Sequence, residues 1–453
     1  MKSRRLVTRR RVLVPLLAAI ALAAGSSAYT VFSPSGLISA TIPLDDSNVQ
    51  SAAIDETTGK VFVALSLSWT NPAVLVVDVR ADRIERTIRT TPAMPPQAIA
   101  PVIALDAHAE RVFVPQDRGG RWSIGLFDDR DGHVVARVPI GGDPYALAVD
   151  ERTGRLVATV SEDANNPAHA VHALVIDIRQ ARVVTNVRLD TVSNEIPTLS
   201  VDDHTGQAYA LSDAGIDVFR EIGVRSVSRL HIGATPSNLV IDTQQHLAFV
   251  PGDANIPYVR AIDLRTGRER YRFACRAFPS SDSDGSGAID AVAGRIIYTD
   301  VGLLPSEPLM VRDEKTGRLI ARVQVGPHAH VVATDSVMGR VYVATQRVDT
   351  TYGSQIGEAD FMPGPGTISV LDARTGRIMG AITVGFGPTS AILDHRSHKL
   401  FVFDSGGLVA TTDPWPWRAL PAWLRDHIPF APPRERGGYV TGADIRVVDT
   451  SRF

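Results

Sequence analysis

Two histidines separated by one residue are the strongest candidates for chemistry in this sequence. His328 and His330 lie in a link between two predicted strands, where imidazoles could bind a metal or a haem. Neither a carboxylate nor a cysteine completes a metal-ligand set at a suitable spacing. We therefore predict no metal and no cofactor. We keep both histidines as candidate binding residues whose imidazoles hydrogen-bond within the protein.

Motifs of catalysis are missing from the sequence. It contains no GxSxG, HExxH, CxxCH or Walker A pattern, and no GxGxxG that precedes a helix. The single cysteine, Cys275, excludes an intramolecular disulfide and has no histidine partner that the sequence can place. We therefore predict no catalytic residue and expect Cys275 to be structural.

Five tryptophans form the second set of candidate binding residues. Three of them, Trp415, Trp417 and Trp423, fall in one long insertion, while Trp69 and Trp122 fall in or beside two earlier loops. Exposed aromatic side chains would suit a sugar, a peptide or a protein partner. The alternative is that these tryptophans fill a small core within the insertion or plug the mouth of a channel.

A repeat positions these residues. An apolar stretch ends in aspartate, four residues follow, and a basic or polar residue opens an apolar strand. Successive copies begin 40 to 59 residues apart. Each copy continues with a second strand pair joined by a tight turn such as Lys315–Arg318, in which Gly317 supplies positive φ. The eight copies begin at Asp55, Asp106, Asp150, Asp202, Asp242, Asp290, Asp335 and Asp394.

Each copy therefore has four strands, here called a, b, c and d in chain order. The b and c strands, such as 61–65 and 74–77, are apolar at consecutive positions, which indicates that both faces of each sheet are buried. A ring of sheets stacked face to face satisfies that requirement. Four strands in roughly 40–50 residues are typical of a β-propeller. The sequence thus predicts an all-β fold with one propeller over residues 37–453.

The ends of the chain predict how the ring closes. The last copy supplies strands a, b and c, the third of these at 445–448, but no strand d. An unassigned strand at 37–43 resembles the other d strands and would complete that blade, which removes an open edge. We predict eight blades. Seven remain an alternative, because strand c of the fourth copy (216–219) lacks the usual ending.

The loops predict a working face. The a–b and c–d turns are short and uniform, whereas the b–c loops and d–a links on the opposite face are long and irregular, so we expect function there. The two largest b–c insertions are 346–366 and 405–442, in neighbouring copies. Residues 421–428 in the second insertion are predicted to form a short helix.

The N-terminus has the pattern of an export signal. Six basic residues in the first eleven precede an apolar run at 12–25 and the small residues 26–28. We predict a signal peptide at 1–28, either of the twin-arginine or the general type and either cleaved or kept as an anchor, then a linker at 29–36. Loss of the six charges takes the formal net charge from −2 to −8, which argues against nucleic-acid binding.

The repeat resembles the YVTN-type β-propeller family of exported bacterial and archaeal proteins. The resemblance rests on Gly339-Arg340 before 341–345 (VYVAT), on the TGR turns, and on Gly-x-x-Pro links such as 141–144. It extends over residues 37–453 and implies the fold alone, because the family includes both binding modules and enzyme subunits.

Two functions follow as hypotheses. The first is an extracytoplasmic, monomeric binding or scaffold module that contacts a protein, peptide or carbohydrate through its long-loop face. The second is an extracytoplasmic enzyme or enzyme subunit, of hydrolase or oxidoreductase type, with a site at the mouth of the central channel. A membrane would be contacted only through an uncleaved signal.

Overall fold

Most of the repeat region is described by the structure, a computed structural model. The described residues are 37–44, 48–66, 73–90, 103–119, 121–162, 170–189, 199–212, 215–221, 228–231, 240–251, 258–275, 288–290, 293–299, 308–326, 329–349, 362–404, 407–409, 439–441 and 443–453. The predicted signal peptide, the linker, the short helix at 421–428 and most of the second insertion lie outside them.

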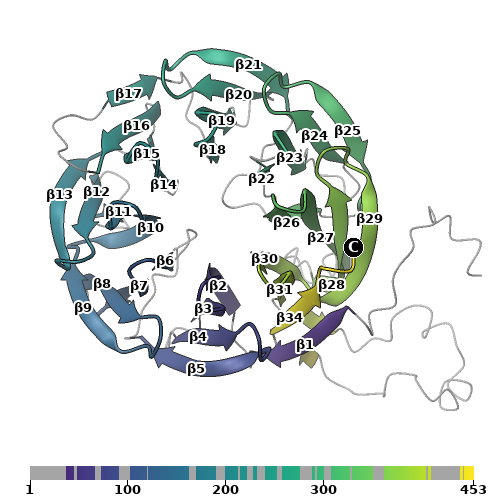
Figure 1. The fold of residues 1–453 in the computed structure, drawn as a ribbon, viewed down its shortest axis with the longest axis horizontal. Helices are drawn as coiled ribbons and strands as arrows, with labels where there is room; N and C mark the ends of the chain where they lie inside the picture. Colours follow the sequence, from purple (N-terminus) through teal and green to yellow (C-terminus); the bar gives the residue numbers. More distant parts are fainter. Residues whose placement is uncertain are drawn as a thin grey trace, which may run out of the picture.

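Eight four-stranded antiparallel sheets form a closed ring, so the chain is a β-propeller with eight blades (Figure 1). The fourth repeat forms a complete sheet, so the prediction of eight blades is confirmed and the seven-bladed alternative is wrong. The regular elements among the described residues are all strands. No helix in that part of the chain could span a membrane.

The first four blades follow one another along the chain. Blade 1 has β2 (Asn48–Asp55), β3 (Lys60–Ser66), β4 (Ala73–Asp78) and β5 (Arg83–Arg89). Blade 2 has β6 (Ala104–Asp106), β7 (Arg111–Asp117), β8 (Trp122–Asp128) and β9 (Val134–Pro139). Blade 3 has β10 (Asp143–Asp150), β11 (Arg155–Ser161), β12 (Val171–Asp177) and β13 (Arg182–Arg188). Blade 4 has β14 (Leu199–Asp202), β15 (Gln207–Ser212), β16 (Gly215–Arg220) and β17 (Ser228–His231).

The remaining blades repeat this order, and the last one takes its outer strand from the N-terminus. Blade 5 has β18 (Val240–Asp242), β19 (Leu247–Pro251), β20 (Tyr258–Asp263) and β21 (Glu269–Ala274). Blade 6 has β22 (Ala288–Asp290), β23 (Arg295–Thr299), β24 (Leu309–Asp313) and β25 (Leu319–Val323). Blade 7 has β26 (His330–Asp335), β27 (Arg340–Asp349), β28 (Met362–Asp372) and β29 (Ile378–Phe386). Blade 8 has β30 (Pro388–Asp394), β31 (Lys399–Asp404), β34 (Asp444–Asp449) and β1 (Ile38–Pro43).

Pairing of β1 with β34 closes the ring, as the sequence predicted. The strands are antiparallel, with Ile38 opposite Val448 and Ile42 opposite Ile445. Figure 1 shows the purple β1 beside the yellow β34. The first and last described segments therefore share one sheet, and blade 8 has no unpaired outer edge.

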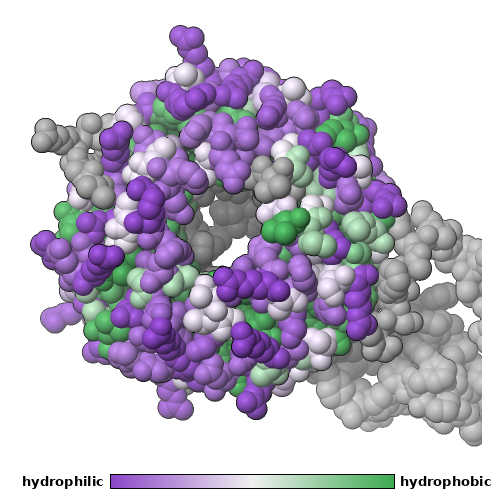
Figure 2. Space-filling model, in the orientation of Figure 1, coloured by the Kyte–Doolittle hydropathy of each residue, from purple (hydrophilic) through white to green (hydrophobic). Residues whose placement is uncertain are grey.

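Burial explains why the inner strands are apolar at consecutive positions. From Val61 to Leu65 in β3, every side chain is buried, because one face of the blade packs against blade 8 and the other against blade 2. The outer strand β5 instead alternates between exposed and partly buried residues, since it lies at the rim. Figure 2 shows a mainly hydrophilic face of the disc, hollowed at its centre.

A hydrogen bond repeated in all eight blades joins the two turns on one face of the disc, here called the turn face. In blade 1, the N–H of Val79, just after strand c, donates to the carbonyl oxygen of Gly59 in the a–b turn at 3.0 Å. The acceptor residue has positive φ in every blade, which glycine adopts most readily. The eight acceptor residues are Gly59, Glu110, Gly154, Gly206, His246, Gly294, Gly339 and His398.

The residues that donate this bond alternate in chemistry around the ring. All eight are buried, apolar in odd-numbered blades and polar in even-numbered blades. At this position the chemistry therefore repeats every two blades. The alternation also places a buried polar group at every second contact between blades. The odd-blade residues are Val79, Ile178, Leu264 and Ala373, and the even-blade residues are Asp129, Glu221, Glu314 and Thr450.

A close backbone approach explains one of the Gly-x-x-Pro links. A Cβ atom added at Gly142 would lie 2.2 Å from the carbonyl oxygen of Ser161, at the start of the β10–β11 pair. We expect Gly142→Ala to lower the free energy of unfolding by about 1–3 kcal/mol, because strand a must shift away from strand b.

Gly154→Ala is the matched control, because its Cβ would meet no atom within 4 Å and only positive φ penalises it. Denaturant unfolding of both variants checks this prediction. Equal stability of Gly142→Ala and the wild type would show that the backbones do not meet there.

Candidate functional site

The structure describes two of the seven residues predicted for the site, Trp122 and His330. The other five lie outside the described residues, and their contacts with a ligand stay predictions. These five are Trp69, Trp415, Trp417, Trp423 and His328.

Trp122 is a packing residue in the described structure. It opens β8, is partly buried, and packs against the hydrophobic cluster between blades 2 and 3 that includes Ile124 and Leu174. Its carbonyl oxygen also accepts a hydrogen bond from the N–H of Ile140 at 3.1 Å.

His330 joins two blades near the centre of the ring. It is the first residue of β26 and is buried, and its Nε2 lies 3.2 Å from the carbonyl oxygen of Thr389 in blade 8. The imidazole thus has a hydrogen-bond partner within the protein, and a role of His330 in ligand binding stays a prediction.

The long-loop face carries a composite projection on blades 7 and 8. The insertion predicted at 346–366 is partly an extension of blade 7, because Val348 pairs with Pro363 and Asp349 with Met362. Within the blade 8 insertion, β32 (Gly407–Val409) pairs with β33 (Tyr439–Thr441). Strand β32 lies beside β28, so the blade 8 insertion contacts the strand that blade 7 extends.

A pair of carboxyl groups lies where the blade 8 insertion leaves the sheet. Asp404 ends β31 opposite Asp444, which begins β34. Asp404 Oδ2 accepts a hydrogen bond from the N–H of Gly385 at 3.0 Å, and Arg446 forms ion pairs with both carboxylates. Burial, together with the charge of Asp444, raises the pKa of Asp404 above its ordinary value. The pair can hold a proton at the edge of the long-loop face.

The turn face has a cavity of about 330 Å³ between blades 2 and 3. Its lining includes Asp106, His108 and Glu151, together with Arg152 and Arg179. His108 Nδ1 lies 2.8 Å from Glu151 Oε2, and Glu151 Oε1 accepts a hydrogen bond from the N–H of Ala107 at 3.1 Å. One nitrogen and two carboxylate oxygens from the three acid and histidine residues lie within 4.8 Å of one another.

The repeat explains why these side chains meet. At two neighbouring junctions, the second residue after the turn aspartate of one blade reaches the first residue after the turn aspartate of the next blade. His108 and Glu151 occupy these places at the junction of blades 2 and 3, and Arg152 reaches the carbonyl oxygen of Asp203 at the next junction. His108 and Glu151 meet because blades 2 and 3 lie side by side, and this contact is not visible in the sequence.

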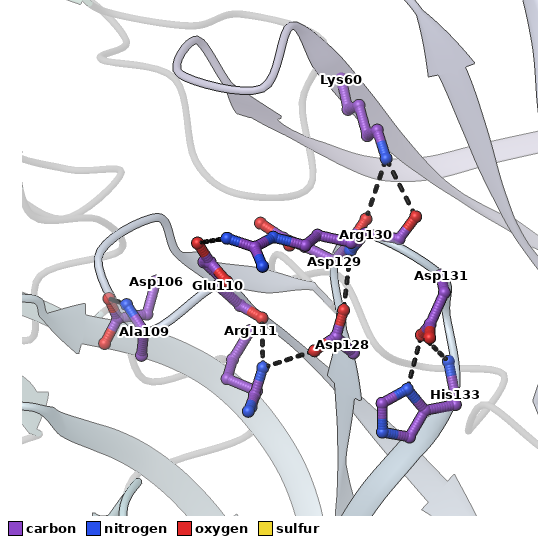
Figure 3. Close-up of polar contacts among 10 residues, drawn as sticks. All are labelled: Lys60, Asp106, Ala109, Glu110, Arg111, Asp128, Asp129, Arg130, Asp131 and His133. Atoms are coloured by element: carbon purple, nitrogen blue, oxygen red, sulfur yellow. Dashed lines mark hydrogen bonds and ion pairs between the residues drawn. The ribbon is translucent and has the colours of Figure 1, made fainter.

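A second group of acidic and histidine residues lies in and beside the c–d turn of blade 2 (Figure 3). Asp128 Oδ1 accepts a hydrogen bond from the N–H of Arg130 at 3.0 Å, and its Oδ2 accepts one from Arg111 at 2.9 Å. Asp131 and His133 are exposed and contact each other through Oδ1 and Nδ1 at 2.5 Å. Both oxygens of Asp128 thus have a hydrogen-bond donor, one in the turn and one on strand β7.

Sequence reasoning missed the cavity because it assigned function to the opposite face. The sequence did contain the relevant residues, His108 in the a–b turn of one copy and Glu151 in the a–b turn of the next. Uniform turn length concealed them, since short turns are usually structural.

Comparisons with known proteins agree with the fold and leave the family open. No protein-family model matches the chain, and no curated protein matches it. The YVTN-type resemblance therefore has no matching family model.

Solved structures resemble the chain over most of its length. BamB from Moraxella catarrhalis superposes with a TM-score of 0.50 at 13% identity, covering 81% of this chain and 96% of its own. The dihydro-heme d1 dehydrogenase NirN, in complex with DHE, superposes with a TM-score of 0.55 at 11% identity, covering 84% of this chain and 76% of its own. At such low identity the likeness shows the fold alone.

Proposed function

We propose that this chain is an exported binding or scaffold module of the YVTN type. Its long-loop face contacts a protein, peptide or carbohydrate outside the cytoplasm. The observation that carries the proposal is the composite projection, in which β32 of the blade 8 insertion lies beside the extended β28 of blade 7. A rigid ring that presents adjoining insertions from neighbouring blades is suited to recognition.

The aromatic content of the insertion supports this proposal. Trp415, Trp417 and Trp423 belong to the same insertion as β32 and β33, and tryptophan is the residue type most enriched at sites that dominate binding energy. The likeness of the fold to BamB and NirN is compatible with either a binding or an enzymatic role.

The test is a comparison of variants on the two faces. Wild-type protein, a Trp415→Ala/Trp417→Ala double variant, and the turn-face control Val337→Ala, at an exposed position of an a–b turn, are immobilised, and cell-envelope extract is passed over each. We expect one defined partner to bind the wild type and the control, and to lose at least about tenfold in affinity for the double variant.

The melting temperature separates binding from packing. A double variant that melts like the wild type and binds less supports the proposal. If the double variant binds as well as the wild type, or if its weaker binding comes with a lower melting temperature, the tryptophans fill a core and the proposal is wrong.

The carboxyl pair at the base of the insertion favours a second candidate function, an enzyme of hydrolase type at the channel mouth. A buried acid with a raised pKa beside a second carboxylate is an arrangement that general acid–base catalysis uses. Screening ester, glycoside and phosphate substrates against wild type and Asp404→Asn tests this candidate. Turnover that the variant loses would support it, and identical profiles would exclude a catalytic role for Asp404.

A further inference from the structure

We propose that Asp106, His108 and Glu151 form a binding site for a divalent transition metal such as Zn²⁺ on the turn face, between blades 2 and 3. One imidazole nitrogen and two carboxylate oxygens suit Zn²⁺ and its neighbours in the first transition row, whereas Mg²⁺ and Ca²⁺ prefer oxygen ligands alone. Three protein ligands leave a fourth position, which a water or an anion in the cavity can fill. This site does not depend on the function proposed for the opposite face.

The distances between the ligand atoms suit one small cation. Tetrahedral Zn²⁺ with ligands at about 2.0–2.1 Å holds its ligand atoms about 3.3 Å from one another. The His108–Glu151 contact is 2.8 Å, and the three ligand atoms lie within 4.8 Å of one another. The exposed His108 side chain and the partly exposed Glu151 can therefore close around an ion by small rotations.

The third ligand, Asp106, carries a buried oxygen that a bound cation would satisfy. Asp106 is 1% exposed, and its Oδ1 accepts a hydrogen bond from the N–H of Ala109 at 2.8 Å. Its Oδ2 is buried and has no hydrogen-bond donor among the described residues. A buried carboxylate oxygen without a partner is costly, and a bound cation would satisfy it.

A hydroxyl donates to this oxygen in blades 1, 4 and 8, whereas Asp150, Asp242 and Asp335 leave Oδ2 without a donor among the described residues, as Asp106 does. In blades 1 and 4, a threonine three residues after the turn aspartate donates its hydroxyl to Oδ2, from Thr58 to Asp55 at 2.6 Å and from Thr205 to Asp202 at 2.7 Å. Blade 2 has Ala109 at this place, so no hydroxyl from this position reaches Asp106, which lines the cavity.

The neighbouring group of Asp128, Asp131 and His133 lacks this feature. Both oxygens of Asp128 accept hydrogen bonds from the turn and from Arg111, and the other two residues are exposed. The two groups have similar residue types, so the second is a matched control for the first.

The experiment titrates Zn²⁺ into the untagged full chain after chelator treatment and follows heat by calorimetry. Co²⁺ serves as a visible probe of coordination. We expect about one equivalent to bind, and His108→Ala and Glu151→Gln each to weaken binding by at least about tenfold. His133→Ala should bind Zn²⁺ like the wild type.

Ala109→Thr separates metal binding from structural damage. The new hydroxyl should donate to Asp106 Oδ2, raise the melting temperature of the metal-free protein, and weaken Zn²⁺ binding. Absence of Zn²⁺ binding to the wild type, or equal affinity in the wild type and His108→Ala, would overturn the proposal. An equally large loss of Zn²⁺ affinity in His133→Ala and His108→Ala would also overturn it.

Discussion

Replacing Ile42 with aspartate is expected to lower the free energy of unfolding by about 4 kcal/mol or more, the largest effect of any single substitution considered. Ile42 is 5% exposed and packs in the hydrophobic cluster that joins blades 8 and 1, with Phe403 and Ile445. The substitution removes apolar burial and places a charge inside a hydrophobic cluster. Because β1 closes the ring, we expect the loss to affect both blades. Denaturant unfolding followed by circular dichroism measures it.

The neighbouring position supplies the control. Thr41 is exposed on the other side of β1, and its hydroxyl accepts a hydrogen bond from Arg446 at 3.2 Å. Aspartate at position 41 can pair with that guanidinium, so Thr41→Asp should change stability by about 0.5 kcal/mol or less. Similar losses for the two variants would mean that β1 has no defined inner and outer side.

Replacing Glu221 with glutamine is expected to stabilise the protein at alkaline pH by on the order of 3 kcal/mol. Glu221 is 1% exposed between blades 3 and 4, and burial together with the charge of Asp150 raises its pKa to about 8. Glu221 Oε1 and Asp150 Oδ2 are both buried without a hydrogen-bond donor among the described residues. A proton on Glu221 can satisfy both oxygens, and glutamine keeps a donor there at every pH.

The direction of the pH dependence follows from where the proton is held. Above the ordinary glutamic acid value of 4.5 the unfolded chain releases this proton, while the folded protein keeps it up to about pH 8. Stability of the wild type therefore falls as pH rises between these two values and then levels off. The difference between Glu221→Gln and the wild type should grow over the same range.

Asp129 provides the comparison at another junction between blades. Burial and the facing Asp55 raise the pKa of Asp129 to about 6. The gain in free energy of unfolding of Asp129→Asn over the wild type should therefore level off near pH 6. Unfolding curves from pH 4.5 to pH 9 distinguish the two variants. If the Glu221→Gln difference were independent of pH, Glu221 would be ionised in the folded protein and the buried acid pair would not exist.

The blade architecture could be predicted because it depends on local signals. Asp55 and its equivalents end strand a in every copy, and apolar runs such as 61–65 require burial on both faces. Closure was predictable because the last copy lacked an outer strand and residues 37–43 supplied one. Each of these inferences needs only the order of residues within one repeat and a count of strands.

Contacts between blades could not be predicted in the same way. Whether Glu221 faces Asp150, or His108 faces Glu151, depends on the angle between neighbouring sheets, which no single repeat encodes. Equivalent places also differ from blade to blade, as the replacement of threonine by Ala109 shows. The candidate metal site therefore became visible only when adjacent turns were placed together.

The extension of blade 7 was missed for a different reason. Residues 346–349 and 362–365 contain Pro363 and Pro365 and lack the apolar run that marks the other strands. Backbone pairing nevertheless continues there past a shift in register between Gln346 and Val348, because β27 and β28 are already paired neighbours. Continued pairing outweighs the weak strand preference of the residues.

A disulfide between positions 41 and 446 tests closure of the ring most directly. Thr41 and Arg446 are opposite each other in the β1–β34 pair, whereas Arg182 lies in the outer strand of blade 3. Under mild oxidation, the Thr41→Cys/Arg446→Cys variant should form an intramolecular disulfide, found by mass spectrometry of peptides, and the oxidised form should melt at a higher temperature than the reduced form of the same variant. The Thr41→Cys/Arg182→Cys control should stay reduced. Failure of the first pair to form the disulfide in folded protein, or equal formation in the control, would contradict a ring closed by its first and last strands.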